Sequence, residues 1–201
     1  MDARDLFLEQ HAAVHSAAVG NNKMSLAERA FAGVTDAQMR VRPRPDLNSL
    51  AWLMFHMARA EDVLVNMTLG GRPQVFDDGW PKRLGVTRRD FGIGMTSDEV
   101  TELSGCIDLG ALREYRDAVG RRTREMVGAF TPQDWQGTVT AEAVQRAAAD
   151  GAFGARTEAL VKGMPGRPRT AMLSGIALMH SAGHLGEAAT VRSAGGFGTG
   201  F

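Results

Sequence analysis

The sequence predicts an all-α protein, a four-helix bundle with long crossover connections. Two observations support this fold class. Apolar residues recur at spacings of three and four along four long segments, which is typical of amphipathic helices. Alternating runs of Val, Ile, Thr and Tyr, typical of strands, are nearly absent, and the 201 residues include a single Tyr. Because each apolar stripe needs a partner stripe, packing the four segments together is the economical arrangement.

The first long helix is expected at residues 3–19. Leu8, His11 and His15 share one face of it at spacings of three and four. The sequence Gly20-Asn21-Asn22 ends it. Two short helices are expected next, near residues 25–33 and 35–39.

The second long helix is expected at residues 49–69, after a stiff connector at 42–45 (RPRP), since residues that precede proline disfavour the helical conformation. Its apolar stripe carries His56 in the middle. Arg59, Asp62 and Asn66 are expected away from the centre of that stripe.

A glycine-rich stretch at residues 70–97 is the least regular part of the chain. So long an irregular segment within a compact domain is unusual and is often a lid or a binding loop. A tolerated surface insertion is an equally good interpretation. A short helix is expected after it, opening at Ser97 with Asp98 and Glu99 in its first turn.

The third and fourth long helices are expected at residues 109–130 and 169–193, with short helices between them. We predict one domain over residues 1–195, with a long insertion at about 70–108. The tail at 196–201 is rich in glycine and is expected to be flexible.

Composition excludes several classes of protein. Lys and Arg number 23 and Asp and Glu number 23, so no excess charge indicates a nucleic-acid partner. No run of about 18 apolar residues predicts a membrane span, and the start of the chain (MDARDLFLEQ) lacks the pattern of a secretion signal. We therefore expect a soluble cytoplasmic protein. A single cysteine, Cys106, excludes an internal disulfide and a multi-cysteine metal site.

The most informative motif is the histidine pair His180 and His184, four residues apart in the last long helix. That spacing places the two Cβ atoms about 6 Å apart, so both imidazoles can point at one spot. If the second and fourth helices are neighbours, His56 can join them. Three protein ligands with one open position are typical of a catalytic metal site. The plainer interpretation is that these histidines are hydrogen-bonded residues of the core.

A second histidine pair, His11 and His15, has the same spacing in the first helix. It could form a second metal site, add a ligand to the first, or be a buried polar pair near a substrate cavity. Glu187, three residues after His184, could fix the tautomer of that imidazole or act as a general base. We slightly favour a solvated charge, or an ion pair of Glu187 with Arg192 or Arg59.

Three stretches together resemble the DinB-like superfamily, over about residues 5–195. They are GVTDAQMRVRPRPDLNSLAWLMFHMARAED, ALREYRDAVGRRTREMV and LMHSAGHLGEAATVR. The superfamily includes YfiT-like hydrolases and mycothiol-dependent maleylpyruvate isomerases. The resemblance implies a four-helix bundle and a metal triad at His56, His180 and His184. It also implies zinc, nickel or iron as the metal, and a low-molecular-weight thiol such as mycothiol as a co-substrate.

The resemblance leads us to expect a metal-dependent thiol S-transferase or thiol-dependent isomerase that acts on a small-molecule substrate. Zinc is the metal we expect first. Glu187 would assist the chemistry, and Arg59 would bind a carboxylate of the thiol or of the substrate. The alternatives are a metal-dependent hydrolase, a non-enzymatic stress-response or binding protein, and a metal-free structural protein. A homodimer is expected from the family, whereas the insertion and the HAAVH motif depart from its usual pattern.

Overall fold

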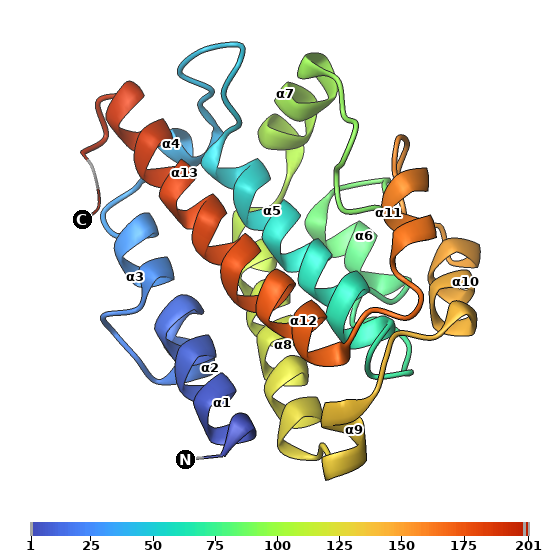
Figure 1. Ribbon diagram of the computed structural model, residues 1–201. Coiled ribbons are helices and arrows are strands. Elements are labelled where there is room, and N and C mark those ends of the chain that lie inside the picture. The colour runs from blue at the N-terminus through green and yellow to red at the C-terminus, as the bar shows by residue number, and fades with distance from the viewer. Residues whose placement is uncertain (1, 199, 201) are drawn as a thin grey trace.

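The computed structural model describes residues 2–198 and 200 and builds them from helices and loops, without a strand (Figure 1). Within those residues the β feature is an isolated bridge between Thr138 and Pro168. The all-α prediction is therefore confirmed. The helices are α1 (Ala3–Val14), α2 (Ala17–Gly20), α3 (Leu26–Phe31), α4 (Asp36–Arg40), α5 (Leu50–Glu61), the π-helix η1 (Asp62–Met67), α6 (Gly79–Leu84), α7 (Ser97–Cys106), α8 (Leu109–Gly128), α9 (Pro132–Gln136), α10 (Ala141–Ala149), α11 (Glu158–Gly163), α12 (Arg169–Met172), the π-helix η2 (Leu173–His180) and α13 (Ser181–Ala194).

Four helical rods form the bundle, and each matches one of the long predicted segments. The rod of α5 and η1 packs against α8 and against α13, while α1 packs against α8 and η2. In Figure 1 the long red rod of α12, η2 and α13 runs alongside the teal α5. This contact between the second and fourth rods is the one on which the predicted histidine site depends.

Side-chain caps fix where the central rods begin. Ser49 accepts a hydrogen bond from the backbone N–H of Trp52 at the start of α5, and Asp108 accepts one from Ala111 at the start of α8. Such caps satisfy donors that have no partner inside the helix. The two rods therefore start at positions set by local sequence.

The rods are less regular than the periodicity predicted. The first predicted helix breaks after Val14, because His15 and Ser16 are extended. Ser16 stabilises the break, donating its hydroxyl to Asp117 at 2.6 Å and its backbone N–H to Nδ1 of His15 at 2.8 Å. The second and fourth rods each contain a π-helical segment, η1 and η2, that apolar spacing does not distinguish from an α-helix.

The segment at 70–108 is a wall of the core, not a surface insertion. It contains α6 and α7, and it contributes Phe76, Trp80 and Phe91 to the buried apolar residues. This wall contacts the second rod through Arg59 and Asp62. Arg59, Asp62 and Asn66, which were expected away from the centre of the apolar stripe, are all buried.

The C-terminal segment contacts the body of the protein through Arg192. The guanidinium of this residue donates to the carbonyls of Arg29, Ala30, Phe197 and Gly198 at 3.0–3.2 Å. Residues 199 and 201 of the predicted tail lie outside the described residues, and the flexibility of the tail stays a prediction.

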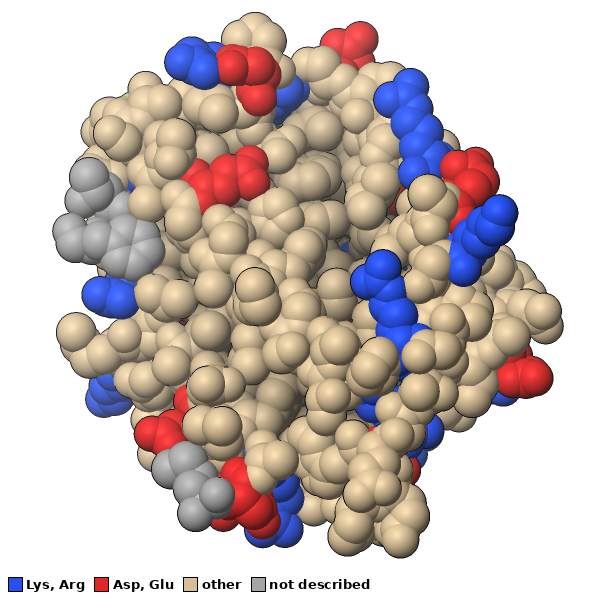
Figure 2. All heavy atoms as spheres, in the orientation of Figure 1, with Lys and Arg blue, Asp and Glu red and all other residues tan. Residues whose placement is uncertain are grey.

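The face that carries α13 and α1 holds few charged side chains, which gather instead toward its rim (Figure 2). Met179, at the end of η2, is 73% exposed. The homodimer expected for the family stays a prediction. Among the described residues, no helix combines the length and the apolar character needed to cross a membrane.

Candidate metal centre

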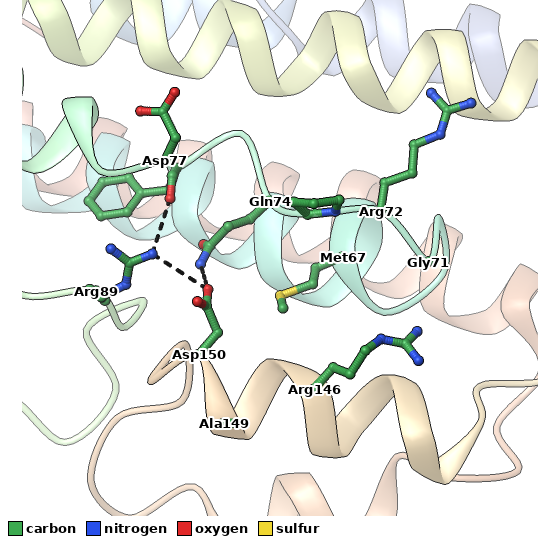
Figure 3. Close-up of a pocket in the computed structure, with 11 residues that line it drawn as sticks. Met67, Gly71, Arg72, Gln74, Asp77, Arg89, Arg146, Ala149 and Asp150 are labelled. Atoms are coloured by element: carbon green, nitrogen blue, oxygen red, sulfur yellow. Dashed lines mark hydrogen bonds and ion pairs between the residues drawn. The ribbon is translucent and has the colours of Figure 1, made fainter.

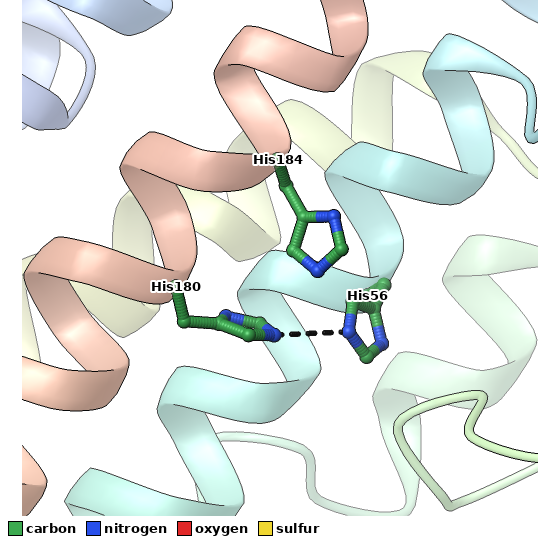
Figure 4. A group of neighbouring side chains, drawn as sticks. All are labelled: His56, His180 and His184. Atoms are coloured by element: carbon green, nitrogen blue, oxygen red, sulfur yellow. Dashed lines mark hydrogen bonds between the residues drawn. The ribbon is translucent and has the colours of Figure 1, made fainter.

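The structure brings together the three histidines that the sequence singled out (Figure 4). His56 comes from α5, His180 ends η2, and His184 lies one turn further along in α13. One ring nitrogen from each lies within 4.8 Å of the others, and the Nε2 atoms of His56 and His180 are 3.0 Å apart. The rings of His180 and His184 meet edge to face, at 82°, so they do not stack.

Hydrogen bonds on the far side of two rings determine which nitrogen is free. Nδ1 of His56 donates to the carbonyl of Phe91, and Nδ1 of His184 donates to Oε2 of Glu187 at 2.8 Å. A proton on Nδ1 leaves Nε2 of each neutral ring with an available lone pair. Nδ1 of His180 is buried and has no hydrogen-bond partner among the described residues.

The rings of His56 and His180 are neutral at physiological pH. Burial lowers the pKa of His56 to about 4, despite the carbonyl of Phe91, which raises it. Burial and the neighbouring His56 and His184 lower the pKa of His180 to about 3. The hydrogen bond from His184 lowers the pKa of Glu187, so this carboxylate is ionised beside the rings.

These residues fit a divalent first-row cation. Such an ion takes neutral imidazole nitrogens at about 2.0–2.1 Å, which places neighbouring donor atoms roughly 3 Å apart. The described residues of this group supply three protein donors, so an exogenous molecule can occupy a further position. The arrangement allows a divalent metal site, and imidazole alone does not select among zinc, nickel and iron.

Glu187 is not the solvated charge that we slightly favoured, and it pairs with neither Arg192 nor Arg59. It holds the ring of His184 and in turn accepts a hydrogen bond at 2.9 Å from the amide of Asn48, just before α5. This is the alternative in which Glu187 accepts the imidazole N–H of His184 and fixes its tautomer. Asn48 had no distinguishing signal in the sequence beyond its place at the start of a helix.

Arg59 lies three residues after His56, but its guanidinium contacts other groups. It is fully buried, donates to the hydroxyl of Tyr115 at 2.7 Å and to the carbonyl of Arg89, and lies 3.3 Å from Asp62. The structure therefore does not bring Arg59 to the three rings as a binder of substrate carboxylates. It fixes the segment that carries the carbonyl of Phe91.

The sequence profile of the DinB superfamily matches residues 24–188, a stretch that contains all three histidines. The chain belongs to the DinB superfamily. A solved structure described as a conserved protein from Enterococcus faecalis is similar over 96% of this chain and 97% of that one, with a TM-score of 0.69 and 18% identity. At that identity the likeness concerns the fold. No curated protein matches the sequence.

Asp62 is a second residue of this DinB protein whose role the sequence did not reveal. It is fully buried and accepts hydrogen bonds from the backbone N–H groups of Val75 and Phe76 at 2.8 and 3.0 Å. The hydroxyl of Tyr115 donates to it at 2.7 Å. Asp62 and Arg59 thus tie the wall at 70–108 to the second rod. Charged residues inside an otherwise apolar helix were the available signal.

A second group of potential ligands lies elsewhere in the bundle. One atom each of His11, His15 and Glu61 lies within 4.8 Å of the others, and all three side chains are buried. Nε2 of His11 is 3.1 Å from Oε1 of Glu61, and the hydroxyl of Thr123 donates to the same oxygen at 2.5 Å. The structure therefore brings the HAAVH pair together with a carboxylate that the sequence had not singled out.

A large cavity among the described residues lies away from both histidine groups. Its volume is about 540 Å³, and its walls include Arg72, Gln74, Arg89 and Asp150. Figure 3 shows Arg89 joined to Asp150, across a distance of 3.6 Å. The amide of Gln74 also donates to Asp150. Asp150 is thus paired with both Arg89 and Gln74, so the cavity makes a weaker case for a reaction centre than the three rings.

Proposed function

We propose that this DinB protein is a divalent-metal-dependent enzyme that joins a low-molecular-weight thiol to an electrophilic small molecule, or uses that thiol in an isomerisation. His56, His180 and His184 would hold the metal. The convergence of three imidazoles from two neighbouring rods supports the proposal most strongly. The thiol comes from the resemblance to thiol-using members of the superfamily.

A divalent cation held there would supply Lewis acidity that lowers the pKa of a thiol. Residues of the chain would orient the rings, admit the substrate and take up a proton. Glu187 and the carbonyl of Phe91 hold two rings so that Nε2 stays unprotonated. The side chains of His184 and Glu187 are 23% and 30% exposed, so a small molecule can reach them from solvent. The ionised Glu187 would take up the thiol proton as the sulfur–carbon bond forms.

Zinc is the metal that we propose first, since it accepts three imidazoles and one exogenous ligand without a strong geometric preference. Nickel and iron are the other candidates. We also propose a cytoplasmic setting and small-molecule partners, because the chain has one cysteine and no net charge.

The decisive experiment combines metal analysis with a thiol assay. The wild-type protein, purified without added metal, should contain a stoichiometric divalent cation and should consume a thiol in the presence of a generic electrophile. His180→Ala should lose both the metal and the activity. Met179→Ala is the matched control, because it removes an exposed side chain next to His180 and leaves the imidazoles in place. A His180→Ala protein that keeps stoichiometric metal would contradict the ligand assignment.

Hydrolysis is the second candidate, favoured by the ionised and partly exposed Glu187 beside the rings. In that reaction Glu187 would take a proton from water instead of from a thiol. Turnover of an ester or amide panel without thiol would favour the hydrolase. Bound metal with no turnover, with or without thiol, would identify a binding protein.

A further inference from the structure

Three arginines are buried in the described part of the chain: Arg59, Arg116 and Arg192. Two of them make several hydrogen bonds each. Arg59 contacts a carboxylate, a hydroxyl and a carbonyl, and Arg192 donates to backbone carbonyls. These partners match the usual requirement that a buried charge be paired and hydrogen-bonded.

Arg116 is the exception. It is 5% exposed, yet it makes no hydrogen bond or ion pair with any residue that the structure describes. Burial lowers the pKa of its guanidinium, and the attraction of Glu61, Asp117 and Glu28 only partly opposes this. A buried cation without a hydrogen-bonded partner is unfavourable unless water or a ligand compensates for it.

An open cavity lies at this side chain. It has a volume of about 330 Å³ and is lined by residues of α2, α3, α5 and α8. Arg116 and Arg113 provide positive charge, while Ala27, Phe31 and Met54 provide apolar wall. Arg116 lines this cavity. Its nitrogens are not among the fully buried side-chain atoms that lack a hydrogen-bond partner, so they are accessible from the cavity.

We propose that this cavity binds a small monocarboxylate whose apolar body lies against Phe31 and Met54 and whose carboxylate pairs with Arg116. The planar guanidinium matches a carboxylate through two parallel hydrogen bonds. The volume lies at the lower end of the range of ligand pockets. None of the three histidines of the metal centre lines the cavity, so the inference does not depend on the proposed function.

Two carboxylates in the wall argue for a monoanion over a dianion. Glu28 accepts the backbone N–H of Ala17 at 2.7 Å, and Asp117 accepts the hydroxyl of Ser16 at 2.6 Å. Both acids are therefore held in place beside the cavity. They would repel a phosphate dianion more strongly than a carboxylate with a single charge.

The test is a calorimetric titration of the full-length protein with hexanoate, with hexanamide as the neutral probe and inorganic phosphate as the dianion. Hexanoate should bind the wild type, and hexanamide and phosphate should bind much more weakly. Arg116→Gln should weaken hexanoate by about tenfold or more, the scale of a lost charge-assisted hydrogen bond. Arg121→Gln, which makes the same charge change at an exposed position of α8, should bind like the wild type.

A second variant tests the cavity without touching the arginine. Ala18→Phe places a large ring at an exposed position of the wall and should abolish binding while circular dichroism shows the helices intact. The proposal is overturned if hexanoate fails to bind the wild type, if Arg116→Gln binds it unchanged, or if phosphate binds more tightly than hexanoate.

Discussion

The two histidine groups of this protein each contain three potential metal ligands within 4.8 Å of one another, but they differ in surroundings and access. His180 and His184 are partly exposed, and an ionised carboxylate, Glu187, faces the group. His11 and His15 are fully enclosed, and the charges that act on His15 besides His11 are those of arginines. Nearby positive charge opposes a second cation, and enclosure removes the route by which one would enter. Ligand spacing alone therefore does not make a metal site.

The enclosed group has a structural role that its hydrogen bonds make plain. His11 on α1 contacts Glu61 on α5, and Glu61 also accepts from Thr123 on α8. One carboxylate thus joins three rods of the bundle. Burial, followed by the charge of Arg116, lowers the pKa of His15 well below its usual value, so this ring is neutral. We interpret the group as a polar junction of the core.

The largest effect on stability is expected from removing the shared carboxylate. Glu61→Ala leaves His11 without its partner and leaves Thr123 with Asn66 as its remaining acceptor. Removing a buried carboxylate from its hydrogen-bond partners costs about 3–5 kcal/mol of unfolding free energy. Urea denaturation of the purified variant measures this. The metal content per folded chain should stay that of the wild type. A Glu61→Ala protein that is stable but has lost a bound ion would mean that the enclosed group is a second metal site.

The next effect concerns packing at His15. A Cβ on Gly120 of α8 would lie 2.5 Å from Nε2 of His15, and the buried ring has no room to retreat. Gly120→Ala should therefore destabilise the protein by about 1–3 kcal/mol. Gly128→Ala is the matched control, since a Cβ at this end of the same helix meets nothing within 4 Å. It should be neutral or stabilise by up to about 1 kcal/mol. Equal effects of the two substitutions would show that the contact with His15 is not tight.

The sequence was sufficient to predict the four rods and the three converging rings, because both follow from spacing along helices. His56, His180 and His184 lie on apolar stripes, and stripes of neighbouring helices must face one another. The hydrogen-bond partners of the Nδ1 atoms of these rings were harder to predict. The carbonyl of Phe91 belongs to a loop, and its position depends on the tertiary contacts of Arg59 and Asp62.

The break of the first rod and the burial of charges were not predictable for a related reason. The local sequence allows Ser16 to lie inside a helix or at a helix break. The break is stabilised by the hydrogen bond from Ser16 to Asp117, about a hundred residues away in sequence. Glu61 carries no local mark of its role, since an acid in a helix is most often solvated. Only the packing of α1, α5 and α8 turns it into a junction.

The smallest effect is a dependence of stability on pH that both groups should share, although only one should respond to metal. In the metal-free protein His56 has a pKa of about 4, against 6.5 for the unperturbed side chain, and His15 is lowered in the same direction. Below pH 6.5 these histidines bind protons in the unfolded chain but stay neutral in the folded chain. The free energy of unfolding therefore falls as the pH drops toward 4. The slope is about 1.4 kcal/mol per pH unit for each histidine.

His56→Asn and His15→Asn should each flatten this slope, as urea denaturation of the metal-free proteins between pH 7 and pH 5 would show. Zinc added at pH 7 should then separate the two variants. A cation that binds only the folded state adds stability in proportion to the logarithm of its concentration over the dissociation constant. It should stabilise His15→Asn as it does the wild type and leave His56→Asn unchanged. If zinc stabilised His56→Asn and not His15→Asn, the assignments of the two groups would have to be exchanged.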